Sequence, residues 1–527
     1  MARLYTCGFE LQSTTGGIEF TSKTDTSSLL SIDTSVKRSG AASLKAVGGA
    51  NPSWVEQMIA SSAGNGPYYT RVYFRLATAP TTRTGVMYIG ESGGTARATM
   101  NIETDSTLKI YANSEMIGSA SAALSTGVWY RLELSYYNNT ATGNTEIEGY
   151  YAVEDNPSIL IAKTKVERRF PSTVQYVRVG ATIATATFEA NYDDWAINDS
   201  TGSYQTSFPG AGHVIHLNPS AAGDSTQWSP STGSNWDCLD EVPLSDTDYV
   251  QQTTIDYVDL YNVQNSGLTS NITVNCVQVG TRHRNSSASA SMAYALRIIK
   301  TTGGTTSDSS NLIPNTTTWS THTTGNPHIY QLTAYNDPDG SAWTRVTLDS
   351  MQIGVVAKVD ASQYIRVSKL WACVDYKPAP ILGKSEIRPA YKYYTKYHAA
   401  SLPSGTTLLT TKFVQANYDD VSSDNAARVS QGVNKYGMFL FKVSSNVGSP
   451  AGVGITWNGQ SAIATTTKTV YLQFYNVSST TWSTADSESL TGADTDFDLT
   501  GTITTPTDYT DANGWINVRV YQEDVDV

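Results

Sequence analysis

Two glutamates spaced for paired-carboxylate chemistry are the first candidates for catalysis in this chain. Glu146 and Glu148 are two residues apart, so on a strand they project from the same face. Glycoside hydrolysis uses two carboxyl groups about 5 to 10 Å apart, one of them held protonated. The other interpretation is that the pair forms the acidic, solvent-facing side of an exposed strand. We favour this interpretation and predict no catalytic residue and no enzyme activity.

A second acidic group could bind a metal ion. Asp193, Asp194 and Asp199 are candidate ligands for Ca²⁺, which prefers six to eight hard oxygen ligands. The alternative is that Asp193 and Asp194 make turn or edge contacts while Trp195 fills the core. A further acidic run could serve the same ion, and it comprises Asp240, Glu241, Asp246 and Asp248. Apart from calcium, the sequence predicts no cofactor.

Histidines and cysteines show no spacing for metal binding or nucleophilic catalysis. His213 and His216 are three residues apart, which on a strand points them to opposite faces. The four cysteines contain no Cys-x-x-Cys pair, so we predict buried, small apolar side chains rather than a zinc site or a disulfide framework. No phosphate-binding glycine loop occurs, and we expect no nucleophile elbow of the hydrolase type.

An aromatic and cationic cluster near residue 394 is a candidate binding surface. Tyrosine and arginine are enriched at protein interfaces, and sugar rings stack on aromatic side chains. We predict a contact between domains or subunits here, with glycan binding and plain sheet packing as the alternatives. The candidate residues are Tyr391, Tyr393, Tyr394 and Tyr397.

The elements that must position these residues are β-strands. Only 16% of the residues are charged, and Thr, Ser, Asn, Gly and Tyr favour strands joined by turns. Apolar residues alternate with polar ones at a period of two, which is typical of half-buried antiparallel strands. Two such series are Tyr130, Leu132, Leu134, Tyr136 and Val470, Leu472, Phe474. The sequence therefore predicts an all-β fold.

The length of the chain and two linker-like segments predict three successive antiparallel β-sandwich domains. A chain of 527 residues is too long for one ordinary core. Ser200–Ser203 has the composition of a short linker, and two prolines in 377–380 favour a stiff connection. The predicted domains are residues 1–203, 204–377 and 378–527.

Charge and hydropathy argue against two classes of partner. The net charge is −12 with no basic block, so we expect no nucleic-acid groove, because phosphate binding needs clustered Lys and Arg. No apolar run approaches the roughly 20 residues that span a bilayer, so we expect no membrane insertion. The first residues do not resemble a signal peptide, and we expect synthesis in a host cytoplasm without one.

Residues 1–203 resemble the laminin G-like or concanavalin A-like jelly roll. The motifs that carry the resemblance are Gly8-Phe9-Glu10, the segment 38–44, the segment 127–134 and the strand with Asp193, Asp194 and Trp195. Phage proteins use this jelly roll at the virion surface, and its lectin members often hold calcium. Concanavalin-like hydrolases carry Glu-x-Asp-x-x-Glu, whereas this chain has Tyr151 where the last glutamate would stand.

The middle of the chain resembles a module of tailed-bacteriophage virion structural proteins. The motifs are Tyr192–Asp199, Phe208-Pro-Gly, Asn235-Trp236, Asp240-Glu241-Val242-Pro243 and the segment 246–250. The resemblance implies a capsid decoration, head-fibre or tail accessory protein on the virion surface. Its partners would be other capsid or tail proteins, further copies of itself, commonly as a trimer, and cell-surface glycans. The alternative is a carbohydrate-active enzyme or lectin with a concanavalin-like domain.

Overall fold

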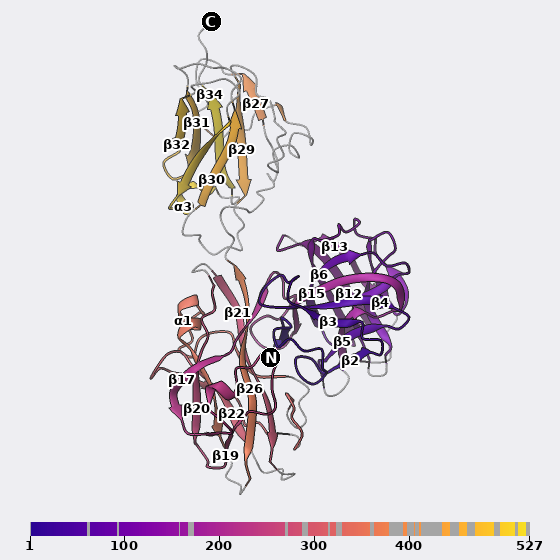
Figure 1. Ribbon diagram of the computed structural model, residues 1–527. Coiled ribbons are helices and arrows are strands. Elements are labelled where there is room, and N and C mark those ends of the chain that lie inside the picture. The colour runs from indigo at the N-terminus through magenta and orange to yellow at the C-terminus, as the bar shows by residue number, and fades with distance from the viewer. Residues whose placement is uncertain are drawn as a thin grey trace. The chain divides into compact units, whose positions relative to one another are not determined.

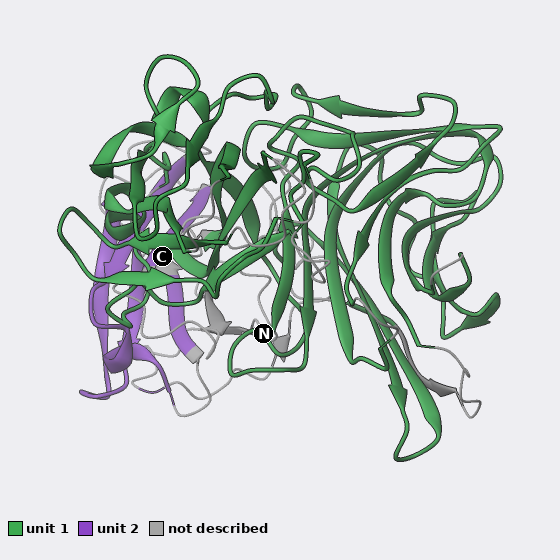
Figure 2. Ribbon diagram, turned by 90° about the horizontal axis from the view of Figure 1, so that it is seen from below, with its two compact units in different colours: residues 1–379 green, residues 380–527 purple. Residues whose placement is uncertain are grey.

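A computed structural model describes most of the first 378 residues and part of the remainder. The described residues are 2–60, 64–91, 94–156, 159–166, 173–268, 272–286, 293–314, 317–322, 329–358, 363–378, 394–397, 405, 411–412, 435–442, 453–460, 469–489, 496–511 and 515–522. The chain forms two compact units, residues 1–379 and 380–527 (Figure 2).

Antiparallel strands make up almost all of the regular structure, so the predicted all-β class is confirmed (Figure 1). The α-helices of the described residues are short: α1 (Arg345–Ser350) and α3 (Pro506–Tyr509). None of the helices in the described part of the chain is long and apolar enough to cross a membrane.

Two sheets form the first sandwich, and both are antiparallel. The eight-stranded sheet has the order β13-β12-β11-β6-β15-β4-β3, with β1 added beside β15, and the seven-stranded sheet has the order β10-β9-β8-β7-β14-β5-β2. The strands are β1 (Arg3–Cys7), β2 (Ser22–Asp25), β3 (Leu30–Asp33), β4 (Ser43–Gly49), β5 (Ser53–Met58), β6 (Tyr68–Thr78), β7 (Thr84–Gly90), β8 (Ala96–Ile102), β9 (Leu108–Ala112), β10 (Glu115–Ile117), β11 (Trp129–Asn139), β12 (Asn144–Val153), β13 (Ile159–Val166), β14 (Tyr176–Ala181) and β15 (Thr185–Asp199).

The core of this sandwich lies between the two sheets. The alternating residues of β11 predicted to face inward are buried there, together with side chains from β7, β8 and β9. The sheets approach so closely at Gly149 that a Cβ would come within 2.5 Å of the Cδ1 of Ile110. A larger residue at this position would require the side chain of Ile110 to move within the packed core.

The second sandwich pairs a six-stranded with a five-stranded sheet. The orders are β18-β19-β26-β21-β24, with β16 added beside β26, and β17-β20-β25-β22-β23. The elements are β16 (His213–Leu217), β17 (Pro219–Thr226), β18 (Ser229–Pro230), the 3₁₀ turn η1 (Trp236–Cys238), β19 (Val250–Gln252), β20 (Val258–Val263), β21 (Ile272–Asn285), β22 (Tyr294–Ile299), β23 (Thr306–Asp308), β24 (Tyr330–Ala334), β25 (Gln352–Ala357) and β26 (Ile365–Pro378).

Residues 380–527 carry their own sheets and their own small core. The six-stranded sheet has the order β28-β27-β29-β34-β31-β32, and β30 pairs with β33. Leu472, Phe474 and Val518 are among the buried residues. The strands are β27 (Tyr394–Tyr397), β28 (Thr411–Lys412), β29 (Lys435–Lys442), β30 (Val453–Gln460), β31 (Thr469–Asn476), β32 (Thr481–Ser489), β33 (Asp496–Ile503) and β34 (Trp515–Gln522).

A shared apolar cluster joins the two sandwiches of residues 1–379. Tyr5 and Trp195 of the first sandwich belong to the same buried cluster as Tyr330 and Trp371 of the second. The Tyr5 ring meets Trp195 edge-on at 5.0 Å and lies 6.3 Å from the ring of Tyr330. The two sandwiches therefore share a continuous core, and the predicted division at residues 203 and 204 stays a prediction.

Candidate functional site

The outer face of the eight-stranded sheet is polar, and cross-strand pairing arranges its side chains in rows. Directly opposed residues of antiparallel strands lie on one face. The first row is Tyr69, Ser135 and Glu148; the second is Arg71, Glu133 and Tyr150; the third begins with Tyr73 and Arg131. This face combines carboxylates, guanidinium groups and tyrosine rings, and it is the candidate binding face of the first sandwich.

The chain's own segment 208–213 covers a large part of this face. The amide of Gly210 donates to the Oε1 of Glu133 at 2.8 Å, and the Nη1 of Arg71 donates to the carbonyl of Gly210 at 3.3 Å. The ring of Phe208 meets the rings of Tyr69 and Tyr150 edge-on, at 5.0 and 5.1 Å. The segment therefore takes the place that a ligand of this face would occupy.

This cover explains a difference from the expected pattern of β11. The sequence predicts a half-buried strand, with Arg131, Glu133 and Ser135 on the opposite side from the core. The structure buries all three on that opposite side. The charged groups of this face can be buried because each keeps hydrogen-bond partners. The amide of Gly210 donates to Glu133, and the carbonyls of Glu154 and Asn156 accept from Arg131.

The aspartates predicted as calcium ligands bind protein groups instead. β15 bulges between Asp193 and Ala196, and Asp194 adopts a left-handed φ of 51°. The carboxylate of Asp194 forms an ion pair of 2.6 Å with Arg38 and accepts the amide of Val214 at 2.6 Å. Trp195 is fully buried, in agreement with the core position predicted for it.

These three aspartates do not fit a calcium site. The Oδ2 of Asp193 accepts the amide of Arg38 at 2.8 Å, and the guanidinium of Arg38 already neutralises Asp194. Burial and the charge of Asp194 raise the pKa of Asp193. Asp199 instead accepts hydrogen bonds from Thr201. Within the described part of the chain, no group of three or more Asp, Glu, His or Cys residues is arranged to hold a metal ion.

The other acidic run is also divided among protein partners. Asp246 accepts two bonds of 2.7 Å from Arg282 and one of 3.0 Å from Ser368. Burial lowers the pKa of Lys369 to about 8, although the nearby charges of Glu241 and Asp240 act to raise it.

Glu146 and Glu148 lie on one face of β12, as their spacing predicts. The Oε2 of Glu148 accepts the hydroxyl of Tyr150 at 2.8 Å, and the Oε1 of Glu146 accepts the amide of Asn139 at 3.2 Å. Both carboxylates raise the pKa of Tyr69, although burial contributes more to that shift. The pair therefore lies half-buried on the polar face, and Glu148 is bonded to Tyr150, one of the two tyrosines that Phe208 covers.

Two buried glutamates were not singled out by the sequence. Burial raises the pKa of Glu10 to about 9 and that of Glu19 to about 8. The Oε1 of Glu19 lies 3.9 Å from the Nε2 of His216, whose pKa burial lowers to about 3. The distance would allow an ion pair, but burial keeps both groups neutral near pH 7. His213, by contrast, reaches Asp155 at 3.1 Å, so the two histidines serve separate sites, as predicted.

A buried ionic cluster joins the two sandwiches at Asp375. Arg3 of β1 forms an ion pair with this carboxylate, and the Nη2 of Arg71 lies 3.5 Å from it. Asn275 donates to its second oxygen at 3.1 Å. Burial acts to raise the pKa of Asp375, but Arg71 and Arg3 hold it below its ordinary value. The carboxylate is therefore charged and binds two strands of the first sandwich to β26 of the second.

The structure describes only part of the predicted tyrosine cluster. Tyr394 and Tyr397 lie in β27, which pairs with β29. Tyr391 and Tyr393 lie outside the described residues, so the predicted contact of this cluster stays a prediction. All four cysteines are buried and free, as expected.

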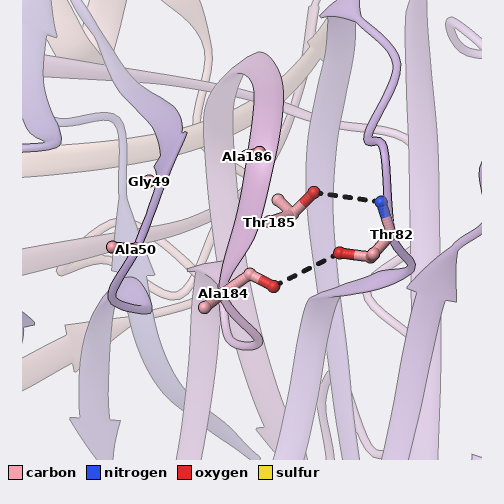
Figure 3. A pocket seen from close by; sticks show the side chains of 6 residues that line it. All are labelled: Gly49, Ala50, Thr82, Ala184, Thr185 and Ala186. Carbon is pink, nitrogen blue, oxygen red and sulfur yellow. Dashed lines mark hydrogen bonds between the residues drawn. The ribbon is translucent and has the colours of Figure 1, made fainter.

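A depression of about 410 Å³ lies beside β15 (Figure 3). It is lined by Gly49, Ala50, Thr82, Ala184, Thr185 and Ala186. Thr82 closes one side through hydrogen bonds of 3.3 Å to the Oγ1 of Thr185 and 3.4 Å to the carbonyl of Ala184. Without charged or aromatic groups in its lining, this depression has little to fix the orientation of a ligand.

Comparisons with known proteins give weak likenesses to a part of the chain. No family model matches, and no curated protein matches either. Among solved structures, the cellulose-induced protein Cip1 is 19% identical over 34% of this chain and 86% of its own, with a TM-score of 0.25. A Trypanosoma rangeli sialidase is 9% identical over 37% of this chain and 30% of its own, with a TM-score of 0.27.

A third similar structure is the catalytic domain of a GH131 β-glucanase from Podospora anserina. It is 13% identical over 35% of this chain and 84% of its own, with a TM-score of 0.24. Values this low carry no argument about activity.

Proposed function

We propose that this chain is a non-enzymatic structural and adhesive protein of a tailed-phage particle. It would be a capsid decoration, head-fibre or tail accessory protein that binds neighbouring virion subunits and host-surface glycans. Assembly as a homo-oligomer, in particular a trimer, belongs to the same proposal, because linked copies multiply weak contacts. The phage assignment rests on the motifs around Phe208 and Asp240.

The observation that carries the structural role is the charged junction at Asp375. An ion pair with no solvent access contributes little net stability, but removing one partner is costly. The junction therefore fixes how the sandwiches of residues 1–379 are joined. A stiff body of this kind suits a protein that presents surfaces on a particle.

The cover over the polar face argues against catalysis at Glu146 and Glu148. A glycosidase must admit a sugar chain between its acid and its second carboxylate. Here the ring of Phe208 packs against the rings of Tyr69 and Tyr150. The hydroxyl of Tyr150 already donates a hydrogen bond to the carboxylate of Glu148. No acid and base in this arrangement face each other across an open cleft.

The phage assignment can be tested on purified virions. Antibodies against the purified chain should label intact virions in electron micrographs, and mass spectrometry should find the chain in particles purified by density gradient. Pre-immune serum is the control for the labelling. Absence of the chain from purified particles would contradict the proposal.

We predict no hydrolysis of host-envelope polysaccharides by the purified protein. The reducing ends released should not exceed those in a blank, and Glu146→Gln and Glu148→Gln should leave this background unchanged. Turnover in the wild type that disappears in either variant would show catalysis by these carboxylates and would establish the enzymatic alternative. Glu189→Gln, which alters a surface pair with Lys45, is the matched control.

A further inference from the structure

Two arginines lie directly opposite each other on the outer face of the second sandwich. Arg284 of β21 and Arg366 of β26 are cross-strand partners, and such partners have Cβ atoms about 4.5–5.5 Å apart. Ile365 and Val367, on either side of Arg366, are fully buried in the core. Alternation therefore directs both guanidinium groups to the outer face.

Neither arginine forms an ion pair with a carboxylate of the described residues. The Nε of Arg366 donates to the Oε1 of Gln251 at 3.0 Å, and the Nη1 of Arg284 reaches the carbonyl of Thr317 at 3.5 Å. The Nε of Arg284 is buried without a hydrogen-bond partner. Arg282, two residues earlier, binds Asp246 through two bonds of 2.7 Å.

This arrangement is unfavourable until an anion joins it. Like charges directly opposite on a sheet destabilise it, and a buried donor without a partner costs further stability. The chain has a net charge of −12 and ample carboxylates, yet the described residues supply none to this pair. A bound anion would offset the repulsion between the two guanidinium groups.

Two aromatic rings hold the guanidinium groups in position. The guanidinium of Arg284 lies 4.7 Å from the ring centre of Trp319, and that of Arg366 lies 4.7 Å from that of Tyr249. The two rings are themselves 6.0 Å apart. Stacking limits the freedom of each arginine, so less entropy is lost when its planar fork binds a ligand.

We propose that Arg284 and Arg366 bind the carboxylate of an acidic sugar in a surface polysaccharide. The inference deepens the proposed adhesive function and rests on it. A carboxylate matches the guanidinium fork with two parallel hydrogen bonds. Gln251 and the hydroxyl of Tyr364, a residue that is 43% exposed just before β26, supply polar groups for sugar hydroxyls.

The surroundings favour a sugar over an acidic protein segment. The centre of a protein interface is apolar and well packed. In contrast, the described residues of β19, β21 and β26 expose no large aliphatic side chain. The site instead offers aromatic rings, an amide and hydroxyls around a pair of cations, which is the chemistry of an acidic glycan.

Calorimetric titration of the full-length protein with a soluble uronic-acid polymer tests the site. The double variant Arg284→Gln/Arg366→Gln should bind about tenfold or more weakly than the wild type, since it loses both charge-assisted contacts. Arg297→Ala, which removes a cation paired with Asp308 on the other sheet, should bind like the wild type. Near-UV circular dichroism should show both variants folded.

Two further arms separate the site from bulk charge. The carboxyl-reduced polymer should not bind, and Arg284→Lys/Arg366→Lys should bind more weakly than wild type but more tightly than the glutamine variant. Equal weakening in Arg297→Ala, unchanged binding of the reduced polymer, or lysine variants equal to wild type would overturn the proposal. Binding of a phosphodiester polymer but not of the uronic-acid polymer would also overturn it.

The outcome can be distinguished from that of the particle experiment. Loss of uronate binding in the glutamine variant together with absence from virions would keep the site and remove the phage assignment. Presence in virions together with equal uronate binding by all variants would keep the phage assignment and remove the arginine site.

Discussion

Asp375→Ala is expected to destabilise residues 1–379 by about 3–5 kcal/mol, because it leaves Arg3 and Arg71 charged and without their buried partner. Both guanidinium groups are fully excluded from solvent, so water cannot replace the lost carboxylate. Urea unfolding followed by tryptophan fluorescence reports the change, since Trp195 and Trp371 lie in the shared core.

The matched control removes a carboxylate from a surface pair. Asp308→Ala breaks the ion pair of 2.7 Å with Arg297. Both side chains of this pair are partly exposed, and such surface pairs contribute about 0–1 kcal/mol to stability. Equal unfolding midpoints for the two variants would contradict a stabilising role for the junction. Joint replacement of Arg3, Arg71 and Asp375 by apolar residues should recover much of the loss, because no uncompensated charge would remain.

Glu19→Gln is expected to flatten the dependence of stability on pH. The pKa of Glu19 rises from an ordinary 4.5 to about 8 in the folded chain because of burial. Between these values the folded state holds more protons than the unfolded state, so stability falls as pH rises, by up to about 1.4 kcal/mol per pH unit. This contribution is complete below the unfolded pKa and is lost as pH rises through about 8.

Unfolding of both proteins at intervals from pH 5 to about pH 9 measures the difference. Glutamine keeps the shape of the side chain and an oxygen for the amide of Leu11, which donates to Glu19 at 3.1 Å. Glu10 contributes a slope of the same sign and His216 one of opposite sign at acid pH, but both are present in each protein. Parallel curves would show that Glu19 is not protonated in the folded state.

The local pattern of residues was enough to predict the strands. The alternation of Tyr130, Leu132, Leu134 and Tyr136 predicted β11, and Trp195 took the core position expected of it. The wide spacing of the cysteines agreed with four buried, free thiols. These features depend on side-chain period and apolar character, which neighbouring residues display directly.

The site depended on contacts between distant segments, and local patterns do not contain them. The sequence pattern places Glu133 on a solvent-facing side because Gly210, whose amide binds it, comes 77 residues later in the chain. Asp193 and Asp194 fitted the composition of a calcium site, but Arg38 lies 155 and 156 residues earlier in the chain and occupies them. Charged residues have no period that reveals their partners.

The contact between Arg3 and Asp375 also has a consequence for synthesis on the ribosome. The two residues are 372 positions apart, and chains grow at about 5–20 residues per second. Arg3 therefore waits roughly 20–75 s for its partner at this growth rate. The nascent first sandwich must remain soluble through that interval with two guanidinium groups that lack their carboxylate, so the last strand of the second sandwich completes both halves together.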